Sequence, residues 1–164
     1  MEYASTTTEI DIAKVAALID GEANININGG LNHRYWQLQI SLGNKDFAML
    51  DWCVARFGGK IYPNFYRKKP SSLYAPFKRW RIQNSEAANL LSLCLNHFVA
   101  KKEQADIAVR FWAIYGPSGA RTSERDRMLC EELRLKLRAL TKRGPRASAE
   151  TPLITRLQRN LFVE

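Results

Sequence analysis

The sequence predicts an α+β domain in which helices cover one face of a four-stranded antiparallel sheet. Two observations carry this prediction. Helical and hairpin patterns follow one another in the order helix, hairpin, helix, hairpin, helices, and consecutive hairpins are typical of an antiparallel sheet. The strand patterns also alternate apolar and polar residues, which indicates that one face of the sheet is buried and the other meets solvent.

A helix and a hairpin come first. Residues from Thr8 to Gly21 place apolar side chains around nearly the whole circumference of a helix, a pattern typical of a buried helix. Residues 24–28 then alternate Asn and Ile, and residues 35–42 alternate again after a turn at Gly29-Gly30. The asparagines therefore share one face of a hairpin whose opposite face is apolar.

A second helix and a second hairpin follow. The helix is expected to begin at Asn44-Lys45-Asp46 and to end at Gly58-Gly59. The strands of the hairpin are expected at residues 60–68 and 74–82. Each strand contains a proline, which favours an edge or irregular position because proline cannot donate to a strand ladder.

The rest of the chain has helical spacing. Ser85 is the expected N-cap of one helix, and two more are predicted at residues 102–115 and 123–140. A chain of 164 residues with 46% apolar content suits a single domain, which we place at residues 1–145. Residues 146–164 are expected to form a C-terminal tail that could contain a short helix.

The charge of the chain points to a polyanionic partner. Lys and Arg total 25 against 16 Asp and Glu, which gives a formal net charge of +9. The charge is also segregated, because residues 60–81 contain seven bases and no acid. Nucleic acid and an acidic membrane face are both polyanions, and a basic soluble protein with neither partner is the plain alternative.

Cysteine usage and the N-terminus predict the compartment. The three cysteines lie far apart, so they suit neither a zinc ribbon nor a disulfide framework. The N-terminus lacks the basic start and apolar stretch of a signal peptide, and no apolar run is long enough for a membrane span. We therefore expect a soluble intracellular protein without a membrane partner.

The polar face of the predicted sheet is rich in amides and cations and contains no acid. Amides pair bidentately with adenine, Arg and Lys pair with guanine, and a two-stranded ribbon fits the major groove of double-stranded DNA. Any solvated sheet face is polar, which is the alternative interpretation, but such a face usually includes Glu and Thr. The residues expected to contact DNA are Asn24, Asn26, Asn28, Arg34, Gln37, Gln39, Tyr62, Asn64, Tyr66, Lys68, Arg79 and Arg81.

The stretch VAALIDGEA, residues 15–23, places two carboxylates where the first helix ends. A helix C-terminus carries partial negative charge, so acids there are disfavoured by roughly 0.3–1 kcal/mol. The stretch resembles the motif of the LAGLIDADG homing endonucleases, with Ala16, Leu18, Ile19 and Asp20 identical and Glu22 in place of the second Asp.

The resemblance extends along the chain in the order of elements over about residues 8–115. Residues 44–46 resemble the family's Gln-Lys-Asp segment, residues 80–82 resemble the end of its fourth strand, and residues 99–105 resemble its lysine-bearing turn between two helices. The resemblance implies a saddle-shaped sheet. Because the chain has one motif, it also implies a homodimer in which the motif helices pack through small residues such as Ala13, Ala16 and Ala17.

The resemblance also implies roles at the end of the motif helix. Glu22 would be a direct ligand of Mg²⁺, or of another divalent cation such as Mn²⁺, with the carbonyl of Gly21 nearby. Asp20 would support the helix end, Asn44 would orient water or a ligand, and Lys101 would polarise the solvent network and screen phosphate. Asn44 as a helix cap and Lys101 as a solvated residue are the structural alternatives.

These observations predict a homodimeric, sequence-specific DNA endonuclease. It would cleave both strands of a long pseudo-palindromic site by metal-dependent phosphodiester hydrolysis. An RNA maturase, which is an intron splicing cofactor, or a DNA-binding regulator with degenerate catalysis on the same fold is the first alternative. A basic interaction domain without base readout is the second.

Overall fold

The computed structural model describes residues 7–30, 35–63, 77–119 and 122–141. The predicted α+β class is confirmed, with helices and one antiparallel sheet in the predicted order. The predicted tail at residues 146–164 lies outside the described residues. The elements are α1 (Glu9–Glu22), β1 (Ala23–Asn28), β2 (Gln37–Asn44), α2 (Phe47–Phe57), β3 (Lys60–Pro63), β4 (Lys78–Gln83), α3 (Asn84–Cys94), α4 (Lys102–Tyr115) and α5 (Glu124–Thr141).

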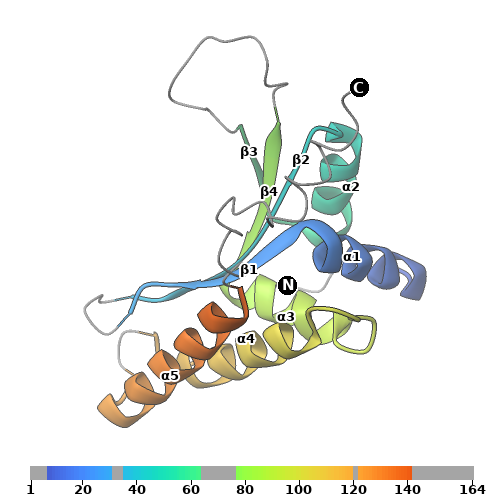
Figure 1. The fold of residues 1–164 in the computed structure, drawn as a ribbon. Helices are drawn as coiled ribbons and strands as arrows, with labels where there is room; N and C mark the ends of the chain where they lie inside the picture. The colour runs from blue at the N-terminus through green and yellow to red at the C-terminus, as the bar shows by residue number, and fades with distance from the viewer. Residues whose placement is uncertain (1–6, 31–34, 64–76, 120–121, 142–164) are drawn as a thin grey trace, which may run out of the picture.

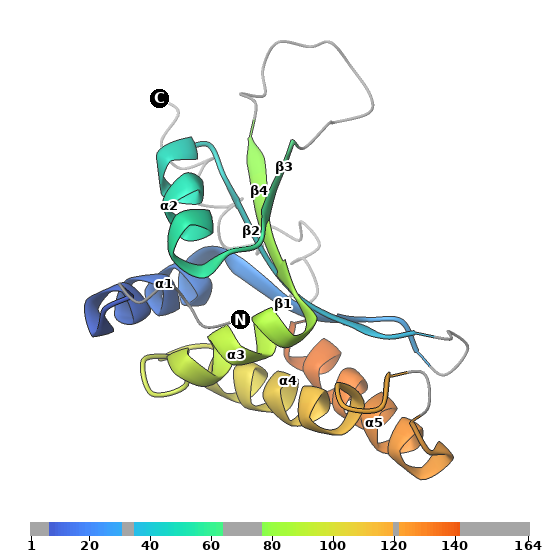
Figure 2. The same ribbon diagram turned by 180° about the vertical axis from the view of Figure 1, so that it is seen from behind.

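The four strands pair in the order β1-β2-β4-β3, and every pair is antiparallel. The first hairpin forms one arm of the sheet and the second hairpin forms the other. The two arms diverge from the centre, so the sheet is strongly curved (Figure 1). Helices α3, α4 and α5 lie along the first arm and α2 lies beside the second, while the concave face carries no helix (Figures 1 and 2).

One core lies between the sheet and the helices. Alternate strand residues enter it, among them Ile25, Leu38 and Ile40, which are fully buried. Trp80 on β4 is also fully buried, and its indole N–H donates to the carbonyl oxygen of Gly58 at 2.8 Å. Because the period of a strand is two, burial of these residues directs their neighbours to the concave face.

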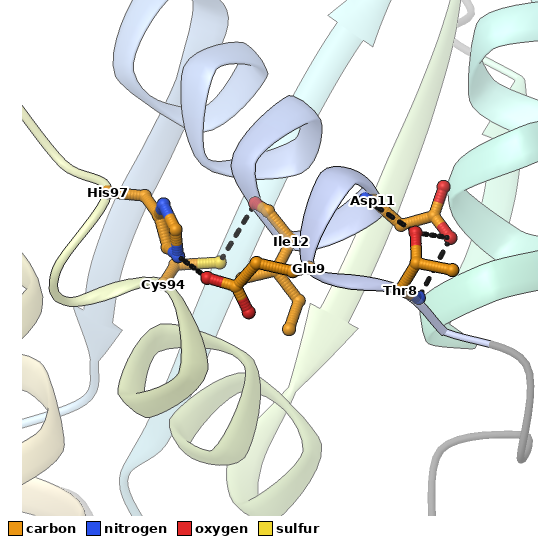
Figure 3. A network of polar contacts seen from close by, with 6 residues as sticks. All are labelled: Thr8, Glu9, Asp11, Ile12, Cys94 and His97. Carbon is orange, nitrogen blue, oxygen red and sulfur yellow. Dashed lines mark hydrogen bonds and ion pairs between the residues drawn. The ribbon is translucent and has the colours of Figure 1, made fainter.

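Helix α1 is held at its N-terminal end by a capping box. The Thr8 hydroxyl accepts from the Asp11 backbone N–H at 3.2 Å, and the Asp11 carboxylate accepts from the Thr8 backbone N–H at 3.1 Å (Figure 3). The Glu9 carboxylate lies 2.8 Å from the His97 Nε2 atom, and the Cys94 thiol lies 3.9 Å from the Ile12 carbonyl oxygen (Figure 3). These contacts fasten α1 to the end of α3.

Two boundaries near the motif differ from the prediction. Helix α1 extends one residue past Gly21, because the chain passes from Glu22 directly into β1 and the Ala23 backbone N–H still donates to Ile19. Strand β2 continues past residue 42 to Asn44, because its last two residues pair with β4. Asn44 is thus a strand residue, and the N-cap of α2 is Asp46, whose carboxylate accepts from the Met49 backbone N–H.

The second hairpin and the following helix also differ. Within the described residues, β3 covers Lys60–Pro63 and β4 covers Lys78–Gln83, so β4 ends one residue later than predicted. Ser85 is not the N-cap of α3. The helix begins two residues earlier than predicted, at Asn84 with Gln83 as its N-cap, because β4 leads straight into it through the positive φ of 55° at Asn84. Over the described ranges, no helix combines the length and the apolar character that a membrane crossing needs.

Candidate nucleic-acid interface and active site

A row of cations and small polar groups crosses the concave face at its centre. The strand register places Asn24 opposite Ser41, Ser41 opposite Arg81, and Arg81 opposite Lys60. These four side chains alternate with core residues on each strand, so they share the concave face. The row spans the whole width of the sheet.

A second row consists of amides only. Asn26 lies opposite Gln39, and Gln39 lies opposite Gln83. The Gln83 side-chain amide donates to the Gln39 side-chain oxygen at 3.1 Å. This bond does not use the Gln39 NH₂ group or the Gln83 side-chain oxygen, so a donor and an acceptor remain side by side. Toward the end of the first arm, Asn28 lies opposite Gln37.

Arg81 is held in place by its neighbours. Its guanidinium lies over the Tyr62 ring at 4.9 Å from the centroid, a cation–π geometry. Its Nε is buried, and no hydrogen-bond partner for it occurs among the described residues. Arg79 lies opposite Gly43 and Tyr62, with its guanidinium 5.9 Å from the Phe77 ring centroid.

The predicted DNA-contacting residues that are described all belong to this face. Arg34, Asn64, Tyr66 and Lys68 lie outside the described residues. Three further residues share the face but were not among those expected to contact DNA, namely Ser41, Lys60 and Gln83. Strand alternation with Arg81 would have identified Gln83, but the predicted strand ended at residue 82. In the described part of the strands, the concave face contains no Asp or Glu.

Glu22 lies at the junction of α1 and β1, on the border of this face. Its carboxylate accepts a hydrogen bond from the Asn44 side-chain amide at 2.7 Å. The Asn44 side-chain oxygen in turn accepts from the Asp46 backbone N–H at 2.9 Å. One hydrogen bond at its NH₂ group and one at its oxygen therefore orient the Asn44 amide, and the NH₂ group points at the Glu22 carboxylate. Glu22 itself is solvent-exposed.

Asp20 points elsewhere, to the turn between α3 and α4. Its carboxylate oxygens accept from the backbone N–H groups of Val99 at 2.7 Å, Ala100 at 3.2 Å and Lys101 at 2.8 Å. Residues two apart on a helix differ in direction by about 200°. The two acids of the motif therefore serve different neighbours, although the sequence places them together.

The Lys101 side chain returns to the end of α1. Its ammonium donates to the carbonyl oxygens of Ile19 at 2.7 Å and Asp20 at 2.5 Å. Burial lowers the pKa of the Lys101 ammonium, and the Asp20 carboxylate offsets part of that shift. A cation thus neutralises the partial negative charge of the helix end at which the two acids lie.

A cleft of about 420 Å³ opens beside Glu22. Its walls come from the end of α1, the start of β1, and the helices α4 and α5. Gln104, Leu140 and Thr141 in this wall were not predicted, because their place in the cleft depends on helix packing. The lining residues are Gly21, Glu22, Ala23, Asn24, Lys101, Gln104, Leu140 and Thr141.

The outer face of α1 carries small residues. Ala13, Ala17 and Gly21 are exposed at intervals of four residues, so they form one stripe along the helix. Ala16, which was expected on this packing face, is instead fully buried in the core. An apolar hollow of about 510 Å³ borders the stripe. It is lined by Lys14, Ala17, Leu18, Met49 and Trp52.

Comparison with known proteins rests on structure. No family model matches the sequence, and no curated protein matches it. The homing endonuclease I-CvuI, solved with the I-CreI target DNA and Mg, has a TM-score of 0.63 at 16% identity, covering 95% of this chain and 98% of that one. The chain has the homing-endonuclease fold. The predicted resemblance to the LAGLIDADG proteins is confirmed for the fold.

Other solved structures agree. I-CvuI with its own target and Ca has a TM-score of 0.62 at 16% identity and covers 94% of this chain and 97% of that chain. The archaeal intron-encoded homing endonuclease I-Vdi141I, complexed with DNA, has a TM-score of 0.67 at 14% identity and covers 85% of this chain and 89% of that chain. In the homing-endonuclease fold of this chain, the motif forms the last turns of α1 and the first residue of β1.

Proposed function

We propose that this chain is a sequence-specific DNA endonuclease that acts as a homodimer and uses a divalent cation to cleave both strands of a long pseudo-palindromic site. One observation carries the proposal: the exposed carboxylate of Glu22 borders a sheet face of amides and cations, whose described part contains no Asp or Glu. The fold shared with homing endonucleases solved on DNA supports it.

The concave face suits DNA because of the groups it presents. Its central row supplies cations for phosphate or guanine, and its second row supplies amides for adenine. Tyr62 fixes Arg81 by stacking, which lowers the entropy that the guanidinium would lose on binding. We infer that β1, β2 and β4 read base edges in a major groove.

The end of α1 fits a magnesium ion of the kind that also contacts phosphate. Mg²⁺ is commonly held by one or two carboxylates, several waters and a substrate phosphate. Glu22 supplies one exposed carboxylate, and Gly21 supplies a carbonyl oxygen at the same helix end. Among the residues that the structure describes, no cluster of three His, Cys, Asp or Glu side chains is placed to hold a metal ion. Further ligands would therefore come from DNA and from a second copy of the chain.

When bound there, a divalent cation would activate water and stabilise a leaving oxygen at a phosphodiester. The residues of this chain would bind the cation and orient its carboxylate ligand. The Glu22 carboxylate would bind it, and the Asn44 amide would keep that carboxylate directed outward through their 2.7 Å hydrogen bond.

The outer face of α1 is the surface that a second copy would cover. Small residues at Ala13, Ala17 and Gly21 allow two helices to approach closely, and a two-fold axis between them would bring both copies of Glu22 together. This arrangement would place one carboxylate from each subunit beneath a single duplex, as cleavage of both strands requires.

The test uses a DNA duplex made by joining the two sequences that flank the reading frame. The purified protein with Mg²⁺ is expected to cut both strands at the junction, and EDTA is expected to abolish cutting. A duplex of scrambled sequence is the control. Tight, site-specific binding without cleavage under these conditions would favour the binding-module alternative, and equal binding to both duplexes would favour the basic interaction domain.

A further inference from the structure

Two sets of hydrogen bonds connect the end of α1 with the turn before α4. In one set a side chain of α1 contacts the backbone of the turn, and in the other a side chain of the turn contacts the backbone of α1. The Asp20 carboxylate accepts from the backbone N–H groups of residues 99–101. The Lys101 ammonium donates to the backbone carbonyl oxygens of Ile19 and Asp20. We call this pair of contacts the Asp20–Lys101 clamp.

Each charge of the clamp meets a helix end of opposite partial charge. Asp20 contacts the N–H groups that directly precede α4, the last of them on its N-cap Lys101, where a negative charge is favourable. Lys101 contacts the last carbonyls of α1, where a positive charge is favourable. The Asp20 carboxylate is therefore unfavourable at the C-terminal end of α1 but favourable at the N-terminal end of α4.

Glu22 follows Asp20 by two residues, at the end of the helical turn that the clamp contacts. Glu22 is the last residue of α1 and is exposed, and among the described residues its side chain accepts one hydrogen bond, from Asn44. Its backbone direction is set by the last turn of α1, and the clamp fastens that turn. Two of the three N–H groups of the Lys101 ammonium are engaged by helix carbonyls.

We propose that Asp20 and Lys101 are positioning residues that place Glu22 for cleavage, and that Lys101 works through the α1 carbonyls rather than on water at the phosphate. This inference rests on the proposed function, because the reaction that it serves is DNA cleavage. The geometry of the clamp is testable without that reaction.

The first test is amide hydrogen exchange of the free protein. Asp20→Asn is expected to raise the exchange rates of residues 99–101 by about tenfold or more, since hydrogen bonds to a charged acceptor are the stronger ones. Asp51→Asn, at an exposed acid on α2, is the matched control and is expected to leave these rates unchanged. Unchanged rates in Asp20→Asn would overturn the clamp, whether or not the protein cleaves DNA.

The second test is single-turnover cleavage with saturating protein, alongside the dissociation constant for DNA. Asp20→Asn and Lys101→Met are each expected to slow cleavage by about tenfold or more and to change DNA binding by less than about threefold. Lys101→Arg is expected to recover part of the rate, because a guanidinium also donates to helix carbonyls. Lys102→Met, at the exposed neighbouring lysine, is the charge-matched control.

The double variant decides how Lys101 acts. If both residues fasten the same two segments, Asp20→Asn with Lys101→Met is expected to be little slower than the slower single variant. If the rate losses of the two single variants instead multiply in the double variant, Lys101 acts in a separate chemical step and the proposal is overturned. Weaker DNA binding at an unchanged rate would overturn it as well. A wild-type protein that cuts no DNA would end the proposed function, while the exchange result would still test the clamp.

Discussion

The amide of Asn44 donates to the carboxylate of Glu22 over 2.7 Å, so the last residue of β2 holds the last residue of α1. The contact joins two segments that are 22 residues apart in sequence. The two acids of the motif therefore have different partners, because Asp20 is engaged by backbone N–H groups of another turn. Of the two, Glu22 is the carboxylate that faces solvent beside the sheet.

Glu22→Gln is expected to retain site-specific DNA binding and to lose cleavage by at least about a thousandfold, because an amide cannot replace an anionic ligand of a hard cation. Binding is measured with Ca²⁺ and cleavage with Mg²⁺. Glu103→Gln, at an exposed acid on α4, is the control. Cleavage at the wild-type rate by the Glu22 variant would refute the metal-ligand role.

Asn44→Asp would place a second carboxylate at hydrogen-bonding distance from Glu22. Two carboxylates at that distance repel unless a proton or a cation lies between them. In EDTA we expect the variant to melt at a lower temperature than wild type, because its free energy of unfolding is lower by about 1–2 kcal/mol. We expect Mg²⁺ to raise the melting temperature of the variant by more than it raises that of wild type. Thermal melts with and without Mg²⁺ measure both effects, and an equal gain in both proteins would contradict the prediction.

Arg81→Ala is expected to weaken binding to the target by about 1–3 kcal/mol and to relax the preference at one base position. Arg81→Lys keeps the charge but loses the bidentate fork, so it is expected to relax the preference with a smaller loss of affinity. Competition with duplexes changed at one position each measures both effects. Arg110→Ala, on the helical side of the molecule, is the control. A loss of affinity that is uniform across sequences would make Arg81 a phosphate contact.

Ala17→Glu is expected to shift the protein from dimer to monomer and to abolish double-strand cleavage. The residue is exposed in the stripe on α1, and a two-fold axis there would bring the two added carboxylates together. Sedimentation velocity over a range of concentrations measures the oligomeric state. Ala113→Glu, at an exposed alanine on α4, is the control. A wild-type protein that is monomeric on its DNA target would contradict the dimer.

The capping box of α1 predicts a pH-dependent stability. The backbone N–H of Thr8, and then the Thr8 hydroxyl, hold the pKa of Asp11 below its ordinary value of 3.8. Since the folded pKa is depressed, the stabilisation is fully present above about 3.8 and is lost as the pH falls through the folded pKa. Asp11→Asn is therefore expected to be less stable than wild type at pH 7, and the difference is expected to shrink toward pH 2 in urea unfolding experiments. A constant difference would contradict this account.

The order of elements could be predicted because it depends on local periodicity. Alternation in β1 and β2 identified the face on which Asn24 and Gln39 lie, and the structure confirms that face. Boundaries were less predictable. Asn44 was placed at the start of a helix, and it became a strand residue because β4 pairs with it. Ser85 suited a cap by residue type, but β4 runs directly into α3, whose N-cap is Gln83, two residues earlier.

The sequence by itself determined that one sheet face is acid-free and polar, and that two acids lie where a helix, predicted to be buried but exposed along its outer face, meets a strand. Both features follow from side-chain periods of 2.0 and 3.6 along a continuous chain. Only the tertiary structure decided the partners of those acids. Asp20 contacts a turn that lies 79–81 residues further along the chain. Glu22 contacts Asn44, which lies 22 residues further along the chain. The physical reason is that neighbouring helix residues point in different directions, so the packing of distant segments decides which group each side chain reaches.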